Sequence, residues 1–388
     1  MESVVSSHLF AGAYDGASVL VTGHTGFKGA WLCEWLLTMG ASVTGYSDSV
    51  ADGSSMFGSI ELESRVNHVL GDVRDFERLS DVIEAARPDY VFHLAAQPLV
   101  RLSYEHPVHT FATNVMGTVN VMESLRVLDF PVACVLVTSD KCYENRETLS
   151  GYREDDHLGG YDPYSASKGA AEVAIHAYRR SYFMSADSRV RIASARAGNV
   201  IGGGDWSADR IVPDSVRNLM ESGVIKVRNP NATRPWQHVL ESLSGYLWLA
   251  ALLSGRAKAP RVKSPLDVSE GFNFGPWPDA NRTVGELVKE ILLNWPGEWD
   301  RVNESEPHHE ASLLGLSVDR AFHKLGWAPA LNFSESVART TQWYQDTLLG
   351  NTGALTKTHS DLAFYADAAA RKGIVWALKH RDNGKGIS

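Results

Sequence analysis

The sequence predicts an α/β protein in which a doubly wound parallel sheet is followed by a smaller α/β part. Short apolar runs alternate with helical patterns through the first half of the chain, which is typical of a parallel sheet covered by helices on both faces. Crossovers between parallel strands are right-handed, and a doubly wound topology follows from that rule. After Asn199 the alternation gives way to shorter helical segments between stretches rich in Gly, Pro and Trp, which indicates a loop-rich second part.

Each element of the first half has its own local signal. The expected strands are short apolar runs, and they cover residues 17–22, 42–46, 68–72, 89–96, 132–138 and 190–196. The expected helices show apolar residues at helical spacing, and they cover residues 29–40, 76–87, 107–128 and 163–183. The first of these helices ends at Gly40, a glycine stop.

Composition excludes several classes of protein. The chain has 388 residues, 44% of them hydrophobic, and a formal net charge of −9 without a Lys/Arg-rich run, which argues against nucleic-acid binding. No apolar run reaches the roughly 18 residues of a membrane span, and the N-terminus lacks the basic start of a signal peptide. Cys33, Cys134 and Cys142 have no metal-ligand spacing, so we expect reduced thiols in a cytoplasmic protein and no metal site.

Three glycines lie between the first expected strand and the first expected helix. Gly23 suits a tight turn, Gly26 lets the backbone approach a pyrophosphate, and Gly29 allows the helix to pack on the strand. The N-terminus of that helix offers N–H groups and partial positive charge to phosphates. Strand, loop and helix together predict a dinucleotide site and a Rossmann-like sheet, with the spacing G-x-x-G-x-x-G.

Two acidic residues are candidates for the adenosine half of the dinucleotide. Asp48 follows the second strand and could accept from a ribose 2′-hydroxyl; the alternative is an exposed loop carboxylate. Asp72, at the end of the third strand, is a candidate for the adenine edge. No arginine comes immediately after the second strand, which favours NAD over NADP.

Tyr164 and Lys168 are four residues apart on an expected helix, so both side chains lie on one face. An ammonium group nearby favours the phenolate and is expected to lower the tyrosine pKa. Such a tyrosine can take a proton from a sugar hydroxyl while the same carbon is oxidised. Ser139, at the end of the preceding strand, completes the expected set.

These residues, with the glycine loop, Asp72, "HLAA" and Asn114, resemble the extended short-chain dehydrogenase/reductase (NAD-dependent epimerase/dehydratase) superfamily over roughly residues 17 to 347. The longer strings "GHTGFKG", "TSDKCYENRE", "GGYDPYSASKG", "ARAGNVIGGGDW" and "NPNATRPWQHV" resemble its sugar-nucleotide 4,6-dehydratases. The resemblance implies an NAD-binding Rossmann domain over 17–198, a mainly substrate-binding part over 199–349 interleaved with it, an N-terminal tail over 1–16 and a C-terminal extension over 350–388. The residues it implies for cofactor binding are Gly23, Thr25, Gly26, Phe27, Lys28, Gly29, Asp48, Asp72, Val73, Leu94, Ala95, Ala96, Tyr164 and Lys168.

The resemblance also gives roles to Asp140 and Lys141, an acid and a base that 4-epimerases lack. The dTDP-sugar enzymes have Asp-Glu here, and Lys141 is the variant associated with the CDP-sugar branch. In the implied reaction Tyr164 acts at the 4-hydroxyl, Lys141 takes the C5 proton and Asp140 protonates the departing 6-hydroxyl, so we expect desolvation to raise the carboxyl pKa and lower the ammonium pKa. A surface salt bridge between them is the structural alternative, which we disfavour because neighbouring strand residues point to opposite faces.

Substrate residues implied by the same resemblance are Asn199, Arg210, Arg234 and His309, the two arginines facing a diphosphate. His308, His309 and Glu310 have no partner cluster for a metal. Helices at 113–125 and 168–183 carry apolar residues beyond one stripe, and in this superfamily such helices form a homodimer. Three alternatives stay open: a dehydratase acting on another nucleotide sugar, a 4-epimerase, and a non-catalytic NAD-binding regulator.

Overall fold

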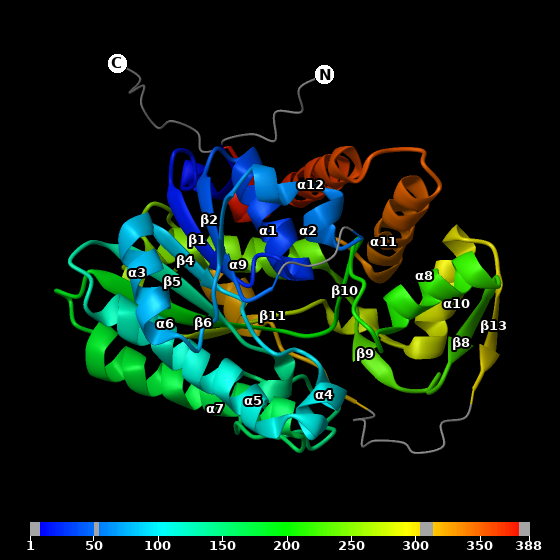
Figure 1. The fold of residues 1–388 in the computed structure, drawn as a ribbon, viewed down its shortest axis with the longest axis horizontal. Helices are drawn as coiled ribbons and strands as arrows, with labels where there is room; N and C mark the ends of the chain where they lie inside the picture. The colour runs from blue at the N-terminus through cyan, green and yellow to red at the C-terminus, as the bar shows by residue number, and fades with distance from the viewer. Residues whose placement is uncertain (1–7, 50–53, 303–312, 380–388) are drawn as a thin grey trace.

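A computed structural model describes residues 8–49, 54–302 and 313–379 of the chain. Its centre is a seven-stranded, fully parallel sheet with the strand order β11-β6-β5-β4-β1-β2-β3 (Figure 1). The predicted α/β, doubly wound fold is therefore confirmed. The strands of this sheet are β1 (Ser18–Thr22), β2 (Ser42–Ser47), β3 (Asn67–Leu70), β4 (Tyr90–His93), β5 (Val132–Val137), β6 (Val190–Ala197) and β11 (Gly271–Phe274).

Helices cover both faces of the sheet (Figure 1). One face carries α1 (Phe27–Thr38) and α9 (Val239–Leu253), and α9 is buried along its whole length because its sequence is apolar on every side. The other face carries α3 (Phe76–Ala86), α6 (Gly117–Arg126) and α7 (Pro163–Tyr178). Each face thereby buries its own hydrophobic cluster.

The order of the strands reverses between β1 and β4. From β1 the chain builds outward through β2 to β3, and from β4 it builds the other way through β5 and β6 to β11. Ligands of open parallel sheets bind at the carboxyl ends of the strands where the order reverses. The loops after β1, β4 and β5 should therefore border the site.

The expected helix over 107–128 consists of α5 (Pro107–Phe111), a π-helical turn at Ala112–Met116 and α6, and α7 continues into a π-helical turn at Arg179–Phe183. The second half forms three small sheets: β7 (Val200–Ile201) with β10 (Gln237–His238), β8 (Val224–Val227) with β13 (Glu298–Arg301), and β9 (Thr233–Pro235) with β12 (Asn281–Thr283). The other regular α-helices of the described residues are α2 (Met56–Ser59), α4 (Val100–Glu105), α8 (Ile211–Glu221), α10 (Val284–Asn294), α11 (Phe333–Leu348) and α12 (Ala354–Arg371).

Both ends of the described chain pack against α1. The Phe10 ring stacks on the Trp376 indole with centroids 4.8 Å apart. On α12, His359 Nε2 lies 2.6 Å from Oε1 of Glu34, a buried residue of α1. The segments before β1 and after residue 350 thus contribute to the core beside the first helix.

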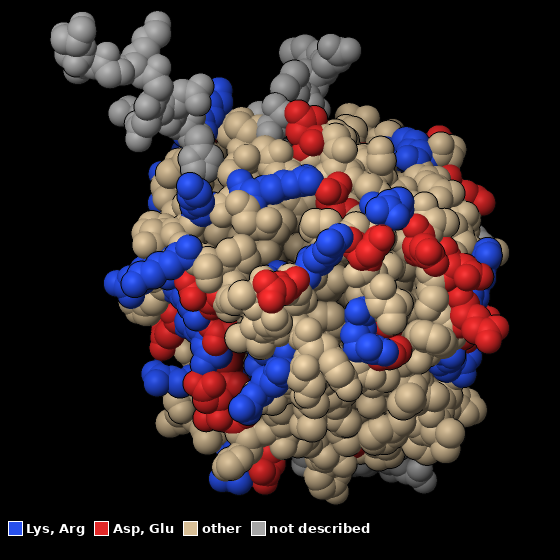
Figure 2. All heavy atoms as spheres, turned by 90° about the vertical axis from the view of Figure 1, so that its left-hand side faces the viewer, with Lys and Arg blue, Asp and Glu red and all other residues tan. Residues whose placement is uncertain are grey.

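Positive and negative side chains are mixed on the face of the molecule that Figure 2 shows. Figure 2 shows one face on which Lys and Arg side chains are interspersed with Asp and Glu, so no large basic field covers that face. None of the helices in the described ranges is long and apolar enough to span a bilayer.

Candidate active site

A cavity of about 1720 Å³ opens at the carboxyl ends of β1, β4 and β5. Its walls come from both parts of the chain: the glycine loop and the turns after β2, β4 and β5 on one side, and residues 197–214 and 226–236 on the other. The strand reversal therefore places the cavity where a doubly wound sheet binds ligands.

The glycine loop has the close contacts that its sequence predicts. Gly23 has a φ of +75°, and a Cβ there would lie 2.7 Å from the backbone nitrogen of Ala95. A Cβ on Gly29 would lie 2.1 Å from the carbonyl oxygen of Gly23. The helix α1 starts directly after Gly26 without a side-chain cap, so its first N–H groups are available to a pyrophosphate. The loop fits a dinucleotide.

The structure brings all but one of the predicted cofactor residues to the cavity wall. Asp48 lies just after β2 and lines the cavity. Asp72 is the exception, because its carboxylate accepts from the backbone nitrogen of Arg74 at 2.8 Å and from that residue's guanidinium. Arg74 also contacts His109 at 3.0 Å. Val73 lines the cavity in place of the neighbouring Asp72 side chain.

Ser139, Asp140 and Lys141 lie in a turn and not on a strand. β5 ends at Val137, and Ser139 caps a 3₁₀ turn formed by Asp140–Cys142 through a 3.2 Å bond from the Lys141 backbone nitrogen. We expected Asp140 and Lys141 to point to opposite faces as neighbours on a strand. That reasoning was wrong, because both residues lie in the turn after the strand. Among the ion pairs of the described residues none joins the two side chains.

The Asp140 carboxyl is buried at the cavity wall, with an exposed fraction of 3%. Its Oδ1 accepts from the Ser139 hydroxyl at 3.0 Å, and its Oδ2 has no hydrogen-bond partner among the described residues. Burial raises the pKa of Asp140, while the Lys141 charge and the Ser139 hydrogen bond act in the opposite direction. A carboxyl in this setting is suited to hold and donate a proton.

Tyr164 and Lys168 both lie on the first turns of α7, which begins at Pro163 and is capped by Asp162. Burial raises the pKa of Tyr164 to about 12, against a lowering by its hydrogen bond with Ser139. The expected net lowering by Lys168 was therefore wrong for this structure, because desolvation of the phenolate exceeds the favourable interactions. Burial also lowers the pKa of Lys168 to about 8, and its Nζ lies 3.5 Å from the Val137 carbonyl.

The buried carboxylate of Glu172 connects α7 to the strands beneath Tyr164 and Lys168. Glu172, one turn after Lys168, accepts from Thr138 Oγ1 at 2.5 Å and from Arg196 at 2.7 Å. Arg196 in turn donates to the Tyr143 phenol oxygen at 2.6 Å. The helix that carries Tyr164 and the turn that carries Asp140 are thus tied together through the interior.

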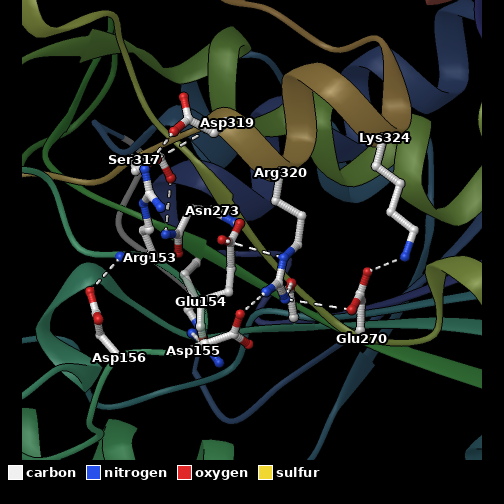
Figure 3. A network of polar contacts seen from close by, with 12 residues as sticks. Arg153, Glu154, Asp155, Asp156, Glu270, Asn273, Ser317, Asp319, Arg320 and Lys324 are labelled. Atoms are coloured by element: carbon white, nitrogen blue, oxygen red, sulfur yellow. Dashed lines mark hydrogen bonds and ion pairs between the residues drawn. The ribbon is translucent and has the colours of Figure 1, made fainter.

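The chain after this turn is anchored to the last strand of the sheet and to residues 317–324 (Figure 3). Glu154 accepts from the Asn273 backbone nitrogen at 2.9 Å and pairs with Arg320 at 3.5 Å. Arg320 also pairs with Asp155 at 2.5 Å and with Glu270 at 3.5 Å. These contacts hold residues 154–155, which lie between the cavity segments 143–145 and 160–162, to elements far away in the sequence.

Of the predicted substrate residues, Asn199, Arg210 and Arg234 line the cavity, and His309 lies outside the described residues. Arg210 pairs with Asp205 at 3.2 Å. Arg234 is buried, and its charge acts to lower the pKa of Asp140. Sequence reasoning missed other charged side chains of the cavity, which belong to none of the motifs that the sequence shows. They include Arg101, Asp209, Lys226, Arg228 and Arg301.

Lys28 was expected at the cofactor, and the structure places it near the acid as well. Burial, followed by the charge of Arg210, lowers the pKa of Lys28 to about 7, and Asp140 acts to raise it. Its Nζ lies 3.5 Å from the Tyr246 hydroxyl. Within the described ranges, no three His, Cys, Asp or Glu side chains are grouped so that they could hold a metal ion.

The comparisons with known proteins agree with this geometry. The family model described as GDP-mannose 4,6 dehydratase matches residues 20–255. The CDP-glucose 4,6-dehydratase of Salmonella typhimurium is 43% identical over 92% of this chain and 98% of its own length. A UDP-glucose 4-epimerase of Mycoplasma pneumoniae is 23% identical over 85% of this chain and 97% of its own. The crystal structure of DesIV, a dTDP-glucose 4,6-dehydratase from Streptomyces venezuelae with NAD and TYD bound, has a TM-score of 0.70 at 23% identity and covers 87% of this chain and 99% of its own.

Proposed function

Because this chain belongs to the GDP-mannose 4,6 dehydratase family, we propose that it is an NAD-dependent CDP-glucose 4,6-dehydratase. It is a hydro-lyase that converts CDP-glucose to CDP-4-keto-6-deoxyglucose. The sugar-nucleotide assignment rests on the 43% identity to the Salmonella typhimurium enzyme over nearly all of both chains.

The observation that carries the dehydratase assignment is the Asp140 carboxyl. It is buried, its pKa is raised by that burial, and one of its oxygens has no partner among the described residues. It lines the same cavity as Tyr164 and Lys141. A 4-epimerase removes no water and needs no such acid beside its tyrosine.

The cofactor site follows from the residues of the glycine loop and the cavity wall. Gly23, Gly26 and Gly29 would hold the pyrophosphate, and Asp48 would accept from the ribose. The turn at Val73 and the segment Leu94, Ala95 and Ala96 would border the rings of the dinucleotide. Asp72 would take part only after release from Arg74. When bound, NAD would supply a reversible hydride acceptor.

The first task of the protein is oxidation at C4. Tyr164 takes the proton of the 4-hydroxyl, and the Ser139 hydrogen bond and the Arg210 charge favour the phenolate that this requires. Lys168 keeps its ammonium close to the end of β5, and Glu172 acts to raise its pKa against burial. The resulting 4-ketone acidifies the C5 proton.

The second task is the loss of water. Lys141 takes the C5 proton, and Asp140 gives its proton to the departing 6-hydroxyl. The hydride removed from C4 would be returned at C6, so the overall conversion neither gains nor loses electrons. Asn199, Arg210, Arg234 and His309 would hold the substrate, the arginines at its diphosphate.

The protein is proposed to be a cytoplasmic homodimer. Exposed apolar side chains occur on α5, α7 and the π-helical turns beside them: Val108 is 82% exposed, Met116 52%, Val173 57% and Tyr182 51%. Such a patch supports a partner surface, and α5 packs beside α7. The three buried free thiols support a reducing compartment.

The test is a panel of CDP-, UDP-, dTDP- and GDP-glucose, each incubated with the protein and NAD, with products identified by mass. Loss of one water from CDP-glucose at the highest rate is the expected outcome. Water loss from another member of the panel would assign a different nucleotide. Products of unchanged mass that differ only at C4 would indicate an epimerase, and no product from any member would indicate a non-catalytic NAD-binding protein.

A further inference from the structure

Two arginines on opposite walls of the cavity share one carboxylate. Arg101 lies on α4, after the sheet strand β4, and Arg228 follows β8 in the smaller part of the chain. Oδ1 of Asp209 lies 3.5 Å from Nη1 of Arg101 and 3.1 Å from Nη1 of Arg228. All three side chains line the cavity. The Asp209 carboxylate thus links the walls between which a substrate must enter.

We propose that the Asp209 carboxylate competes with the substrate's diphosphate for the same two arginines. It holds Arg101 and Arg228 at the cavity until a nucleoside diphosphate displaces it. This inference rests on the proposed function only in requiring a ligand with two adjacent phosphates. Asp209 is then a residue that sets the affinity of the substrate site for a diphosphate, where sequence reasoning named only its neighbour Arg210.

Charge explains why the exchange favours a diphosphate. A diphosphate carries more negative charge and more acceptor oxygens than one carboxylate, so it can accept from both guanidinium groups at once. The Asp209 pairs are solvent-accessible, with exposed fractions of 39% for Arg101, 36% for Arg228 and 46% for Asp209. Pairs with that exposure are weak, so a phosphate ligand can replace them.

The backbone supports the same role. Asp209 has a φ of +59°, in the left-handed region that aspartate and asparagine tolerate better than most residues. The preceding carboxylate of this loop, Asp205, holds Arg210 at 3.2 Å in the same way. The loop from 205 to 210 therefore presents two carboxylates to cavity arginines, and Asp209 is the one shared between the two walls.

The direct test is Asp209→Asn, which keeps the size and the tolerated backbone conformation and removes the charge. Binding of CDP is measured by calorimetry at low and high salt. If Asp209 competes with the diphosphate, the variant should bind CDP roughly three- to tenfold more tightly at low salt, and less of this gain should remain at high salt. Weaker binding of CDP would overturn the inference, because Asp209 would then organise the site and not compete for it.

A control carboxylate separates competition from a general change of charge. Asp214 also lines the cavity, but its carboxylate pairs with Arg217 at 2.5 Å. Asp214→Asn should change the affinity for CDP by less than about twofold. An equal gain in both variants would overturn the proposed competition.

A second control removes the arginines. In an Arg101→Ala/Arg228→Ala background CDP should bind more weakly, and adding Asp209→Asn should no longer tighten it. A gain that persists without the arginines contradicts the inference. The same titrations with UDP should give the same gain, since Asp209 acts at the diphosphate. If the unaltered protein bound UDP more tightly than CDP, the proposed CDP-sugar substrate would be wrong, but the competition by Asp209 would not be affected.

Discussion

The Ser139 hydroxyl donates to one oxygen of the Asp140 carboxyl over 3.0 Å and leaves the other oxygen without a partner among the described residues. The same hydroxyl can instead bond the Tyr164 phenol, an interaction that acts to lower the pKa of Tyr164. The Ser139 hydroxyl thus lies between Tyr164, which is assigned to the oxidation step, and Asp140, which is assigned to the loss of water. Substitutions on its two sides should therefore separate the two steps.

Asp140→Asn should stop the loss of water and spare the oxidation at C4. The amide keeps the shape and an acceptor oxygen but cannot give a proton to the leaving hydroxyl, so the rate of 6-deoxy product should fall by ~10²–10⁴-fold. Reduced cofactor should accumulate with CDP-glucose, seen by its absorbance. Tyr164→Phe is the matched control, in which no reduced cofactor should appear. Normal product formation by Asp140→Asn would remove this residue from the mechanism.

NAD should bind more tightly than NADP, and Asp48 should be responsible for much of the difference. Its carboxylate lines the cavity just after β2, where it would repel a 2′-phosphate. Asp48→Asn should bring the two dissociation constants closer, mainly by improving NADP, when both are measured by calorimetry. Tighter binding of NADP by the unaltered protein would show that Arg74, which lies nearby, governs this end of the site.

Val108→Asp should convert the proposed dimer to a monomer in sedimentation at micromolar protein concentration. The side chain is 82% exposed on α5, and burying a carboxylate in an apolar interface is strongly unfavourable. Leu293→Asp is the control, because this side chain is 78% exposed but lies on α10. A dimer that survives the first change, or dissociates equally with the second, speaks against an interface on α5 and α7.

Glu241 should make the protein less stable as the pH rises. It is buried on α9, and burial raises its pKa to about 7 while the backbone nitrogens of Ala330 and Leu331 act to lower it. Between the usual carboxyl value and about 7 the folded state binds more protons than the unfolded state, so stability falls as pH increases through this window.

The change that isolates this effect is Glu241→Gln, which cannot titrate. Relative to this variant, the unaltered protein should lose about 1–3 kcal/mol of unfolding free energy between pH 5 and pH 8. Urea unfolding at the two pH values measures it. If the free energies of unfolding of the two proteins changed equally between pH 5 and pH 8, the Glu241 carboxyl would not titrate in that range.

The strands and the glycine loop could be predicted because their signals are local. Apolar runs and helical spacing located β1 to β6, and the strand–loop–helix arrangement located Gly23 and Gly29. β11 could not be placed in this way, since a short apolar run carries no information about which distant strand it will pair with. Its partner β6 lies more than seventy residues earlier in the chain.

The site could be predicted only where its residues share one motif. Tyr164 and Lys168 lie one helical turn apart, so spacing alone places them together. Arg101, Asp209 and Arg228 lie on three elements, and only the folded chain brings them to one place. The raised pKa of Tyr164 and the pairing of Asp72 with Arg74 depend on burial and on side-chain geometry, which spacing does not report.

The central claim is that this protein removes water from CDP-glucose through the acid and base beside Tyr164. It is tested most directly by incubating the protein with NAD and CDP-glucose in deuterated water and determining the mass and the deuterium position of the sugar product. The account predicts a 4-keto-6-deoxy sugar that has lost one water and carries one solvent deuterium at C5. A hexose that keeps its 6-hydroxyl would contradict it.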